Sequence, residues 1–217
     1  MAERQDVIRA VEEEKIVAIL RGIPGEKIIP VAEALYNGGI RLLEVTYSSN
    51  GAVSDQQTAS YIRSLAEYFA GRMYIGAGTV LKAEQVQLTK EAGGLFIISP
   101  DTDREVIEET RRLEMVSMPG ALTPTEVNAA HKYGADFVKL FPVSNMGPGY
   151  VKAIKAPLSH IKLLAVGGVD ENNMADYLKA GVCGFGIGSN ITDKKMIENE
   201  DYEGITELAR KFVAVVK

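Results

Sequence analysis

The feature that most constrains the fold of this 217-residue chain is the regular alternation of short apolar runs with longer amphipathic stretches. We find eight apolar runs, at residues 16–20, 40–46, 73–79, 95–99, 115–118, 136–141, 162–167 and 185–188. Helical patterns lie between them, including residues 26–39, 83–94, 104–114, 123–135, 171–181 and 205–217. Strands that alternate with helices indicate βα units and a mainly parallel sheet. Eight units, with an extra helix at about residues 3–14, predict a (β/α)8 barrel rather than an open doubly wound sheet.

The predicted helices carry specific start and stop signals. Thr123 and Glu126 have the spacing of a capping box with Pro124 at the first helical position, and Ser54 with Gln57 repeats that spacing. Glycines that we expect to act as left-handed helix caps follow the periodic segments at Gly38, Gly93, Gly134 and Gly181. Nothing resembling a linker interrupts the pattern, so we expect residues 1–217 to form one barrel domain.

Composition narrows the class of partner. The formal net charge is −5 and the basic residues are scattered, which argues against nucleic acid and favours a small-molecule partner. No apolar run approaches the roughly 18 residues of a membrane span, so we expect no membrane partner. Cys183 is the only cysteine, which excludes an intrachain disulfide, and residues 1–15 lack the apolar segment of a secretion signal. We therefore expect a cytoplasmic protein.

Polar and glycine residues collect where the predicted strands end. In a (β/α)8 barrel the active site is built at the carboxyl ends of the strands. The residues at or just beyond those ends are Arg21 and Gly22, Glu44 and Thr46, Gly78 and Thr79, Ser99 and Pro100, Pro119 and Gly120, Lys139 and Phe141, Gly167 and Gly168, and Gly188 and Ser189. These positions are the candidates for chemistry.

Two charged residues stand out because they lie inside apolar runs. Side chains alternate along a strand, so Glu44 shares a face with Leu42, and Lys139 shares one with Phe137. If both faces line the barrel, burial makes Lys139 either an ion-pair partner or an amine with a depressed pKa. A neutral lysine attacks ketones to form Schiff bases, which makes an adjacent C–C bond breakable. Alternatively, Lys139 faces the helices and reaches solvent, and Glu44 is a structural ion-pair partner.

Two glycine-bearing loops indicate a phosphate site. Gly167 and Gly168 end the seventh predicted strand, and Gly188 and Ser189 end the eighth. Barrels of this kind commonly hold phosphate there, on backbone N–H groups. Neither nucleotide-binding glycine motif is present, so a phosphorylated small substrate is favoured over a nucleotide. His131 and His160 are expected to be surface residues that form no metal set, and we expect neither a metal nor a cofactor.

Several motifs in order resemble one enzyme family. They are Arg21-Gly22, EVT at 44–46, GAGTV at 76–80, SP at 99–100, PG at 119–120, KLFP at 139–142 and GG at 167–168. Together they look like the aldolases that act on 2-keto-3-deoxy-6-phosphogluconate (KDPG) and 4-hydroxy-2-oxoglutarate (KHG). The resemblance runs from about residue 16 to residue 191. It implies a metal-independent class I aldolase, a (β/α)8 barrel and a homotrimer.

The resemblance also implies roles for individual residues. Lys139 would form the Schiff base, and Glu44 would move protons through a bound water. The substrate would be held by Arg21, Thr79, Pro100 and Phe141, and its phosphate by Gly167, Gly168 and Ser189. Ser48 stands where many members have an arginine for the pyruvyl carboxylate, so that group would be bound by Ser48, Thr79, Arg21 or backbone amides. Val166 stands where well-known members have a threonine.

The implied reaction is cleavage of KDPG to pyruvate and glyceraldehyde 3-phosphate, or of KHG to pyruvate and glyoxylate, or both. Two other functions fit the residues alone. A sugar-phosphate isomerase or epimerase would let Glu44 and Lys139 exchange protons without a covalent imine. A non-catalytic barrel would only bind a metabolite.

Overall fold

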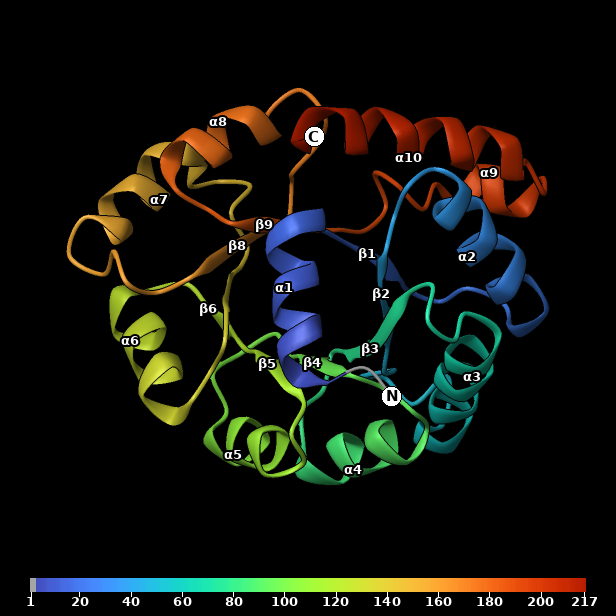
Figure 1. Cartoon of the computed structure of the whole chain (residues 1–217), viewed down its shortest axis with the longest axis horizontal. Helices are drawn as coiled ribbons and strands as arrows, with labels where there is room; N and C mark the ends of the chain where they lie inside the picture. The colour runs from blue at the N-terminus through green and yellow to red at the C-terminus, as the bar shows by residue number, and fades with distance from the viewer. Residues whose placement is uncertain (1–2) are drawn as a thin grey trace.

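The computed structural model describes residues 3–217 as a parallel β-barrel ringed by helices (Figure 1). The strands are β1 (Ile16–Leu20), β2 (Leu42–Thr46), β3 (Tyr74–Gly78), β4 (Phe96–Ile98), β5 (Val116–Met118), β6 (Gly120–Ala121), β7 (Val138–Leu140), β8 (Leu163–Val166) and β9 (Gly184–Ile187). The helices are α1 (Arg4–Glu14), the short η1 (Gly25–Lys27), α2 (Ile28–Asn37), α3 (Asp55–Tyr68), α4 (Ala83–Glu91), α5 (Arg104–Arg112), α6 (Pro124–Tyr133), α7 (Gly147–Lys155), α8 (Met174–Ala180), α9 (Lys194–Glu198) and α10 (Tyr202–Val216).

The strands pair in the order β5-β4-β3-β2-β1-β9-β8-β7-β6, and every pair is parallel. The two ends of this sheet are consecutive in the chain, because β5 and β6 flank Pro119. Proline has no N–H to donate to a ladder, so β5, which lies within the predicted run at 115–118, ends before it, and β6 is a further short strand beyond that run. The nine strands therefore correspond to eight βα units in a nearly closed barrel, and the predicted (β/α)8 barrel with an extra N-terminal helix is confirmed.

Two apolar cores keep the barrel in shape. The outer core lies between the barrel wall and the surrounding helices, and it includes Leu43 and Val45 of β2. The inner core fills the barrel, where Leu42 and Phe137 pack with Val7 and Val11 of α1. Figure 1 shows α1 crossing the centre of the ring, so this helix covers one end of the barrel.

A charged cluster ties the start of α1 to the barrel. Arg4 pairs with the carboxylate of Asp136, which also lies 3.3 Å from Arg111 and accepts the Ser117 N–H at 3.0 Å. Asp136 lies just before the start of β7, so the ion pair holds α1 at the amino-terminal end of the barrel strands. The carboxyl ends of the strands are left as the open end, where the sequence predicts the active site.

Most of the predicted helix signals are confirmed. Thr123 and Glu126 form the reciprocal capping box of α6, and Ser54 accepts the Gln57 N–H at the start of α3. The glycines at 93, 134 and 181 have φ values of 86°, 106° and 105°. The prediction for Gly38 is wrong, because its φ is −77° and the left-handed residue is Gly39, at 100°. Gly38 is glycine for another reason: a Cβ there would overlap the side chain of Ala209 in α10. Within residues 3–217, the helices are all too short or too polar to span a bilayer.

Candidate active site

Lys139 and Glu44 both point into the barrel. Each shares a strand face with a residue of the inner core, Phe137 for Lys139 and Leu42 for Glu44. Only 6% of Lys139 and 1% of Glu44 is exposed, which excludes an outward, solvated orientation for either. The barrel-facing arrangement expected from strand alternation is therefore confirmed.

Burial shifts the proton affinity of both groups. It raises the pKa of the Glu44 carboxyl above its ordinary value, and the positive charges of Lys139 and Arg21 offset part of that rise. Burial also lowers the pKa of the Lys139 ammonium; Glu44 opposes this shift and the Arg21 charge adds to it. Both shifts favour the uncharged forms of the two groups.

The carboxylate of Glu44 is free to act on a ligand. Neither Oε1 nor Oε2 has a hydrogen-bond partner among residues 3–217, although both atoms are fully buried. A buried carboxylate without a partner is costly and rare in folded proteins. The two oxygens without a partner in the barrel interior make Glu44 a candidate for proton transfer.

Gly78 makes room for Glu44. The two residues lie on adjacent strands, and a Cβ at position 78 would overlap Oε1 of Glu44. The space that a Cβ on Gly76 would take, two residues earlier on β3, is likewise occupied by the ring of Phe96. The GAG of the GAGT motif is thus explained by close packing of the neighbouring side chains.

Arg21 and Thr79 meet across the mouth of the barrel. Arg21 Nη2 donates a hydrogen bond to Thr79 Oγ1 at 3.0 Å, which joins the loop after β1 to the loop after β3. Thr79 has a φ of 54°, which is a strained conformation for a β-branched residue. This pair offers a guanidinium and a hydroxyl close to the Lys139 and Glu44 charges, a combination suited to a carboxylate.

Phe141 lies against the lysine. The Lys139 Nζ is 4.8 Å from the centroid of the Phe141 ring, and Phe141 is 37% exposed. Pro100 follows β4, and its carbonyl lies so close to Gly120 that a Cβ there would overlap it. Since Gly120 pairs with Lys139, the loop after β4 reaches the neighbourhood of the amine.

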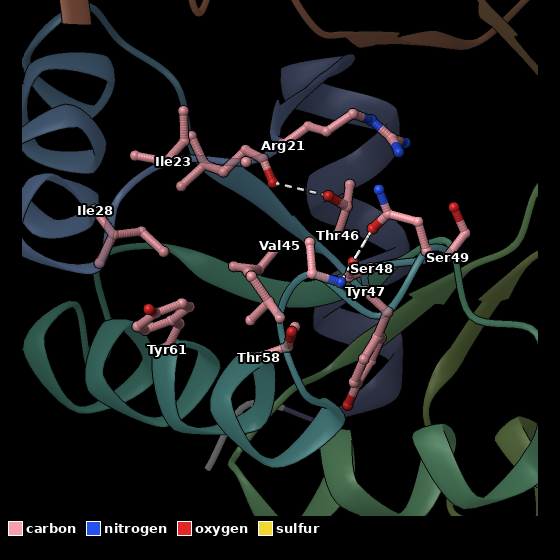
Figure 2. Close-up of a pocket in the computed structure, with 15 residues that line it drawn as sticks. Arg21, Ile23, Ile28, Val45, Thr46, Tyr47, Ser48, Ser49, Thr58 and Tyr61 are labelled. Atoms are coloured by element: carbon pink, nitrogen blue, oxygen red, sulfur yellow. Dashed lines mark hydrogen bonds between the residues drawn. The ribbon is translucent and has the colours of Figure 1, made fainter. Parts of the chain in front are cut away.

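Ser48 is oriented differently from the other predicted residues. Its hydroxyl donates to Asn50 Oδ1 at 2.7 Å within its own loop. Figure 2 shows it with Arg21 and Thr46 around a cavity of about 290 Å3 between the loops after β1 and β2. Ser48 therefore lies next to Arg21, but its hydroxyl is already engaged.

The two glycine loops adopt conformations that other residues would resist. Gly167 and Gly168 have φ values of 91° and 76°, and a Cβ on Gly168 would lie 2.6 Å from that of Ser144. Their backbone can therefore come close to a ligand. Gly188 and Ser189 line a second cavity, of about 530 Å3, that also reaches Arg21.

The rings of the two histidines are in contact. The rings of His131 and His160 pack edge to face with their centroids 5.0 Å apart, on the surface of the protein. Both are surface residues, as expected, but their separation in sequence was a poor guide to their separation in space. Within residues 3–217, no group of three or more His, Cys, Asp and Glu side chains is placed to hold a metal ion.

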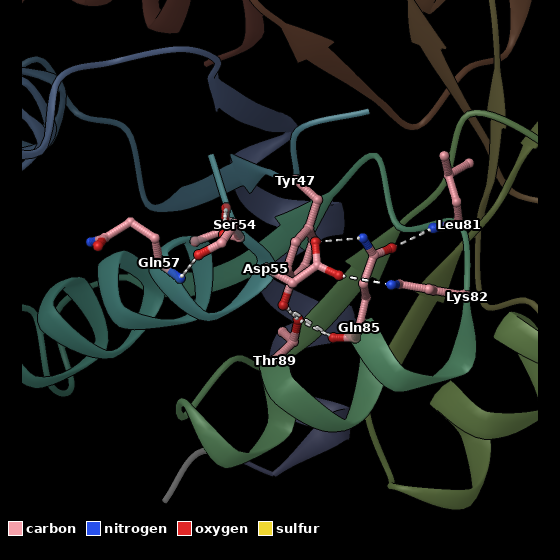
Figure 3. A network of polar contacts seen from close by, with 9 residues as sticks. Tyr47, Ser54, Asp55, Gln57, Leu81, Lys82, Gln85 and Thr89 are labelled. Carbon is pink, nitrogen blue, oxygen red and sulfur yellow. Dashed lines mark hydrogen bonds and ion pairs between the residues drawn. The ribbon is translucent and has the colours of Figure 1, made fainter. Parts of the chain in front are cut away.

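Four residues near the site carry no motif and were missed. Tyr47, Asp55, Lys82 and Gln85 form a polar network between the loops after β2 and β3, shown in Figure 3. Tyr47 follows β2, Asp55 begins α3, Lys82 precedes α4, and Gln85 lies within α4. These positions share no regular spacing, so the periodicity of the sequence gives no signal for the network.

Comparisons with known proteins agree with this geometry. The family model described as KDPG and KHG aldolase matches residues 7–208. The 2-dehydro-3-deoxy-6-phosphogalactonate aldolase of Escherichia coli is 37% identical over 81% of this chain and 83% of that protein. The 2-dehydro-3-deoxy-phosphogluconate aldolase of Haemophilus influenzae is 31% identical over 98% of both chains. A crystal structure of the KDPG aldolase of Legionella pneumophila, with pyruvate captured as a covalent carbinolamine, has a TM-score of 0.83 at 30% identity and covers 94% of this chain and 96% of that one.

The chain belongs to the KDPG and KHG aldolase family. It is an aldolase, a carbon–carbon lyase, with the barrel of the class I enzymes. This assignment favours C–C bond cleavage over the isomerase or epimerase and over the non-catalytic barrel that the residues alone left open.

Proposed function

We propose that this enzyme cleaves a 6-phosphorylated 2-keto-3-deoxy sugar acid to pyruvate and glyceraldehyde 3-phosphate through a Schiff base on Lys139. The observation that carries the proposal is a buried amine whose pKa is lowered, sharing the barrel with a buried carboxylate whose two oxygens have no partner within residues 3–217. An uncharged amine is the form that attacks a carbonyl. The protonated Glu44 carboxyl would give its proton to the water that leaves the carbinolamine, and the carboxylate so formed would accept a proton in the cleavage step.

The reaction begins at the ketone. The neutral Nζ of Lys139 adds to C2 of the substrate, and loss of water from the carbinolamine gives an iminium. Phe141, against the amine, shields this cation from solvent. The carbinolamine reported for the Legionella pneumophila relative is the intermediate that this first step would form, which supports the same step here.

Bond cleavage follows from the electron demand of the iminium. Glu44 accepts the proton of the C4 hydroxyl, the C3–C4 bond breaks, and its electron pair moves into the iminium to give an enamine. The aldehyde leaves, the enamine is protonated at C3, and water releases pyruvate and the free amine. Each positioned proton transfer contributes on the order of 10² to 10⁴ in rate.

Arg21 and Thr79 are proposed to hold the pyruvyl carboxylate. The family arginine is replaced by Ser48, whose hydroxyl is bonded to Asn50. The guanidinium of Arg21 already reaches Thr79 Oγ1, and its charge acts on both Glu44 and Lys139. A guanidinium with a neighbouring hydroxyl gives a carboxylate charge-assisted hydrogen bonds. Pro100 is proposed to form the wall of this pocket.

The phosphate is proposed to bind at the two glycine loops of the barrel mouth. Gly167 and Gly168 follow β8, and Gly188 and Ser189 follow the adjacent strand β9. Their backbone N–H groups would take the phosphate oxygens.

The substrate is proposed to be the phosphogalactonate or the phosphogluconate derivative, which differ only in configuration at C4 and give the same products. The relatives described above carry both names. Val166 cannot donate a hydrogen bond to the substrate, whereas well-known family members have a threonine at this position. The phosphogalactonate derivative is favoured because the relative of that name is the more similar in sequence. Cleavage of 4-hydroxy-2-oxoglutarate to pyruvate and glyoxylate remains a secondary activity to test.

We also propose that residues 1–217 act as one catalytic domain, that the enzyme is a homotrimer, and that it works in the cytoplasm without a metal or cofactor. The trimer follows only from the family resemblance. Mass measurement of the native assembly tests it.

A panel assay tests the proposed reaction. Pyruvate release is measured with both C4 epimers, with and without the 6-phosphate, and with 4-hydroxy-2-oxoglutarate. The expected result is that kcat/KM is highest for a phosphorylated epimer. No pyruvate from any member of the panel would overturn the proposed function.

A further inference from the structure

A buried polar network joins the loop after β2 to the loop after β3, and Gln85 of α4 lies at its centre (Figure 3). Its side-chain Oε1 accepts the Leu81 N–H at 2.9 Å, and its Nε2 donates to Asp55 Oδ1 at 3.0 Å. The other oxygen of Asp55 pairs with Lys82 at 2.9 Å. Gln85 is only 6% exposed, so its amide is committed to these two bonds.

The same residue is tied to the end of β2 through its backbone. The Tyr47 hydroxyl donates to the carbonyl of Gln85 at 3.2 Å and shares a hydrogen bond with Thr89 Oγ1 at 3.0 Å. The Tyr47 N–H donates to the carbonyl of Gly78 at 2.8 Å. Tyr47 is 1% exposed, and burial raises the pKa of its hydroxyl to about 12, so it stays a donor. Gln85 thus holds both loops at once.

The loop after β3 needs such support because of Thr79. A β-branched residue at a φ of 54° is strained and persists only where its surroundings fix it. Val80, next to Thr79, is buried in the outer core, and its N–H donates to the carbonyl of Ile98 at 3.3 Å. Leu81 follows and is 45% exposed, and the hydrogen bond from its N–H to Gln85 ties this part of the loop to α4.

We propose that Gln85 is a positioning residue for substrate binding: by holding the 79–82 loop against α3, it keeps the Thr79 hydroxyl in line with Arg21. This inference rests on the proposed role of Arg21 and Thr79 at the pyruvyl carboxylate. Gln85 lies on α4 and does not touch the reacting atoms, whereas Lys139 and Glu44 lie on β7 and β2. Loss of its contacts is therefore expected to weaken substrate binding and to spare the chemical steps.

The test uses an isosteric change with a matched control. Gln85→Glu keeps the side-chain size but sets a carboxylate against Asp55. Gln87→Glu makes the same change two residues away on α4, where Gln87 donates to Glu109 of α5 at 2.9 Å. The double variant Gln85→Glu/Asp55→Asn exchanges acid and amide, so the hydrogen bond between the two side chains is restored in the opposite direction. Both Gln85 variants keep a side-chain oxygen at position 85 that can accept the Leu81 N–H.

Half-saturation constants report substrate positioning, and limiting rates report the chemical steps. The KM for cleavage, and the pyruvate concentration that gives half-maximal borohydride trapping, are both expected to rise at least about fivefold in Gln85→Glu. The limiting rates are expected to stay within about twofold of the wild-type values. Gln87→Glu is expected to match the wild type in both constants, and the double variant is expected to recover most of the loss.

The outcomes distinguish this inference from the proposed function. Unchanged KM and half-saturation in Gln85→Glu would overturn the role of Gln85, as would an equal rise in Gln87→Glu or a rise that the exchange variant does not reverse. An absence of trapping in the wild type would instead overturn the Schiff base on Lys139. The KM of cleavage would still test Gln85 in that case.

Discussion

The carboxylate of Glu44 lies directly over the Cα of Gly78, in the position that a side chain on that residue would take. The two residues are on neighbouring strands, β2 and β3, in the interior of the barrel. The space left by the missing Cβ therefore decides where the proposed proton carrier stands. Because barrel interiors are closely packed, an added methyl group at position 78 is expected to displace the Glu44 carboxylate.

Replacing Gly78 with alanine is expected to displace Glu44 while leaving Lys139 in place. We expect kcat to fall at least about 100-fold, the lower end of what a positioned acid or base supplies. Steady-state cleavage kinetics, with the circular dichroism spectrum as a check of folding, measure this. Gly149→Ala is the control, since no atom lies within 4 Å of a Cβ at that position and kcat should not change. A Gly78→Ala enzyme with wild-type kcat would contradict the role of Glu44.

The pH dependence of imine formation follows from the lowered pKa of Lys139. The amine is neutral above its folded pKa, so trapping should rise with pH and level off well below the value of about 10.4 of an ordinary lysine. The rate of pyruvate-dependent inactivation by borohydride, measured between about pH 5 and pH 10 with correction for borohydride decay, gives the profile. A rate that climbs without a plateau up to pH 10 would show an unperturbed lysine.

The buried pair is expected to cost stability. The folded pKa of Lys139 is lowered, so the unfolded chain binds the extra proton and folding is disfavoured below about pH 10.4. The folded pKa of Glu44 is raised, so Glu44 favours folding while its carboxyl group is protonated. This stabilisation is lost as the pH rises above the pKa of an ordinary glutamate and through the raised pKa of the folded state. Both are unfavourable at pH 7. The inactive double variant Lys139→Met/Glu44→Leu should be more stable by about 1–4 kcal/mol in urea unfolding at that pH. Lower stability than the wild type would show that the pair contributes favourably.

Val166 is expected to influence which C4 epimer is used. It ends β8 next to Gly167, is 6% exposed, and has no group to bind a hydroxyl. Val166→Thr adds one hydrogen-bonding hydroxyl at this position, and the two epimers present the C4 hydroxyl in different directions. We expect kcat/KM for the phosphogluconate derivative to rise about 5–10-fold relative to the phosphogalactonate derivative, the effect of one hydrogen bond. Competition between the two epimers for one enzyme measures the ratio, and an unchanged ratio would remove Val166 from substrate selection.

Much of the architecture could be predicted because it depends on local periodicity. Alternation along two strands placed Glu44 and Lys139 inside the barrel, and the capping residues at 54 and 123 gave the starts of α3 and α6. The split between β5 and β6 depends on which neighbour each half pairs with, and no single-strand pattern carries that information. The segment Gly147-Pro148-Gly149 opens α7; a proline is tolerated in the first turn, but the two glycines lower the helix propensity of this segment.

The candidate site was less predictable where it depends on contacts between distant segments. Arg21 and Thr79 are 58 residues apart, and their hydrogen bond follows from the barrel and not from either motif. Gln85 is one polar residue among several in α4, and only the closed fold shows that its amide faces Asp55. The engagement of Ser48 with Asn50 is likewise a property of the folded loop.

The central claim is that Lys139 forms a covalent imine with the substrate ketone. Its most direct test is borohydride reduction of the enzyme in the presence of pyruvate, followed by mass spectrometry of the peptides. We predict a lasting mass gain of one reduced pyruvyl group on the peptide that contains Lys139, with parallel loss of activity. Full activity after this treatment with no modified Lys139 peptide, or continued cleavage by a Lys139→Ala enzyme, would contradict the account.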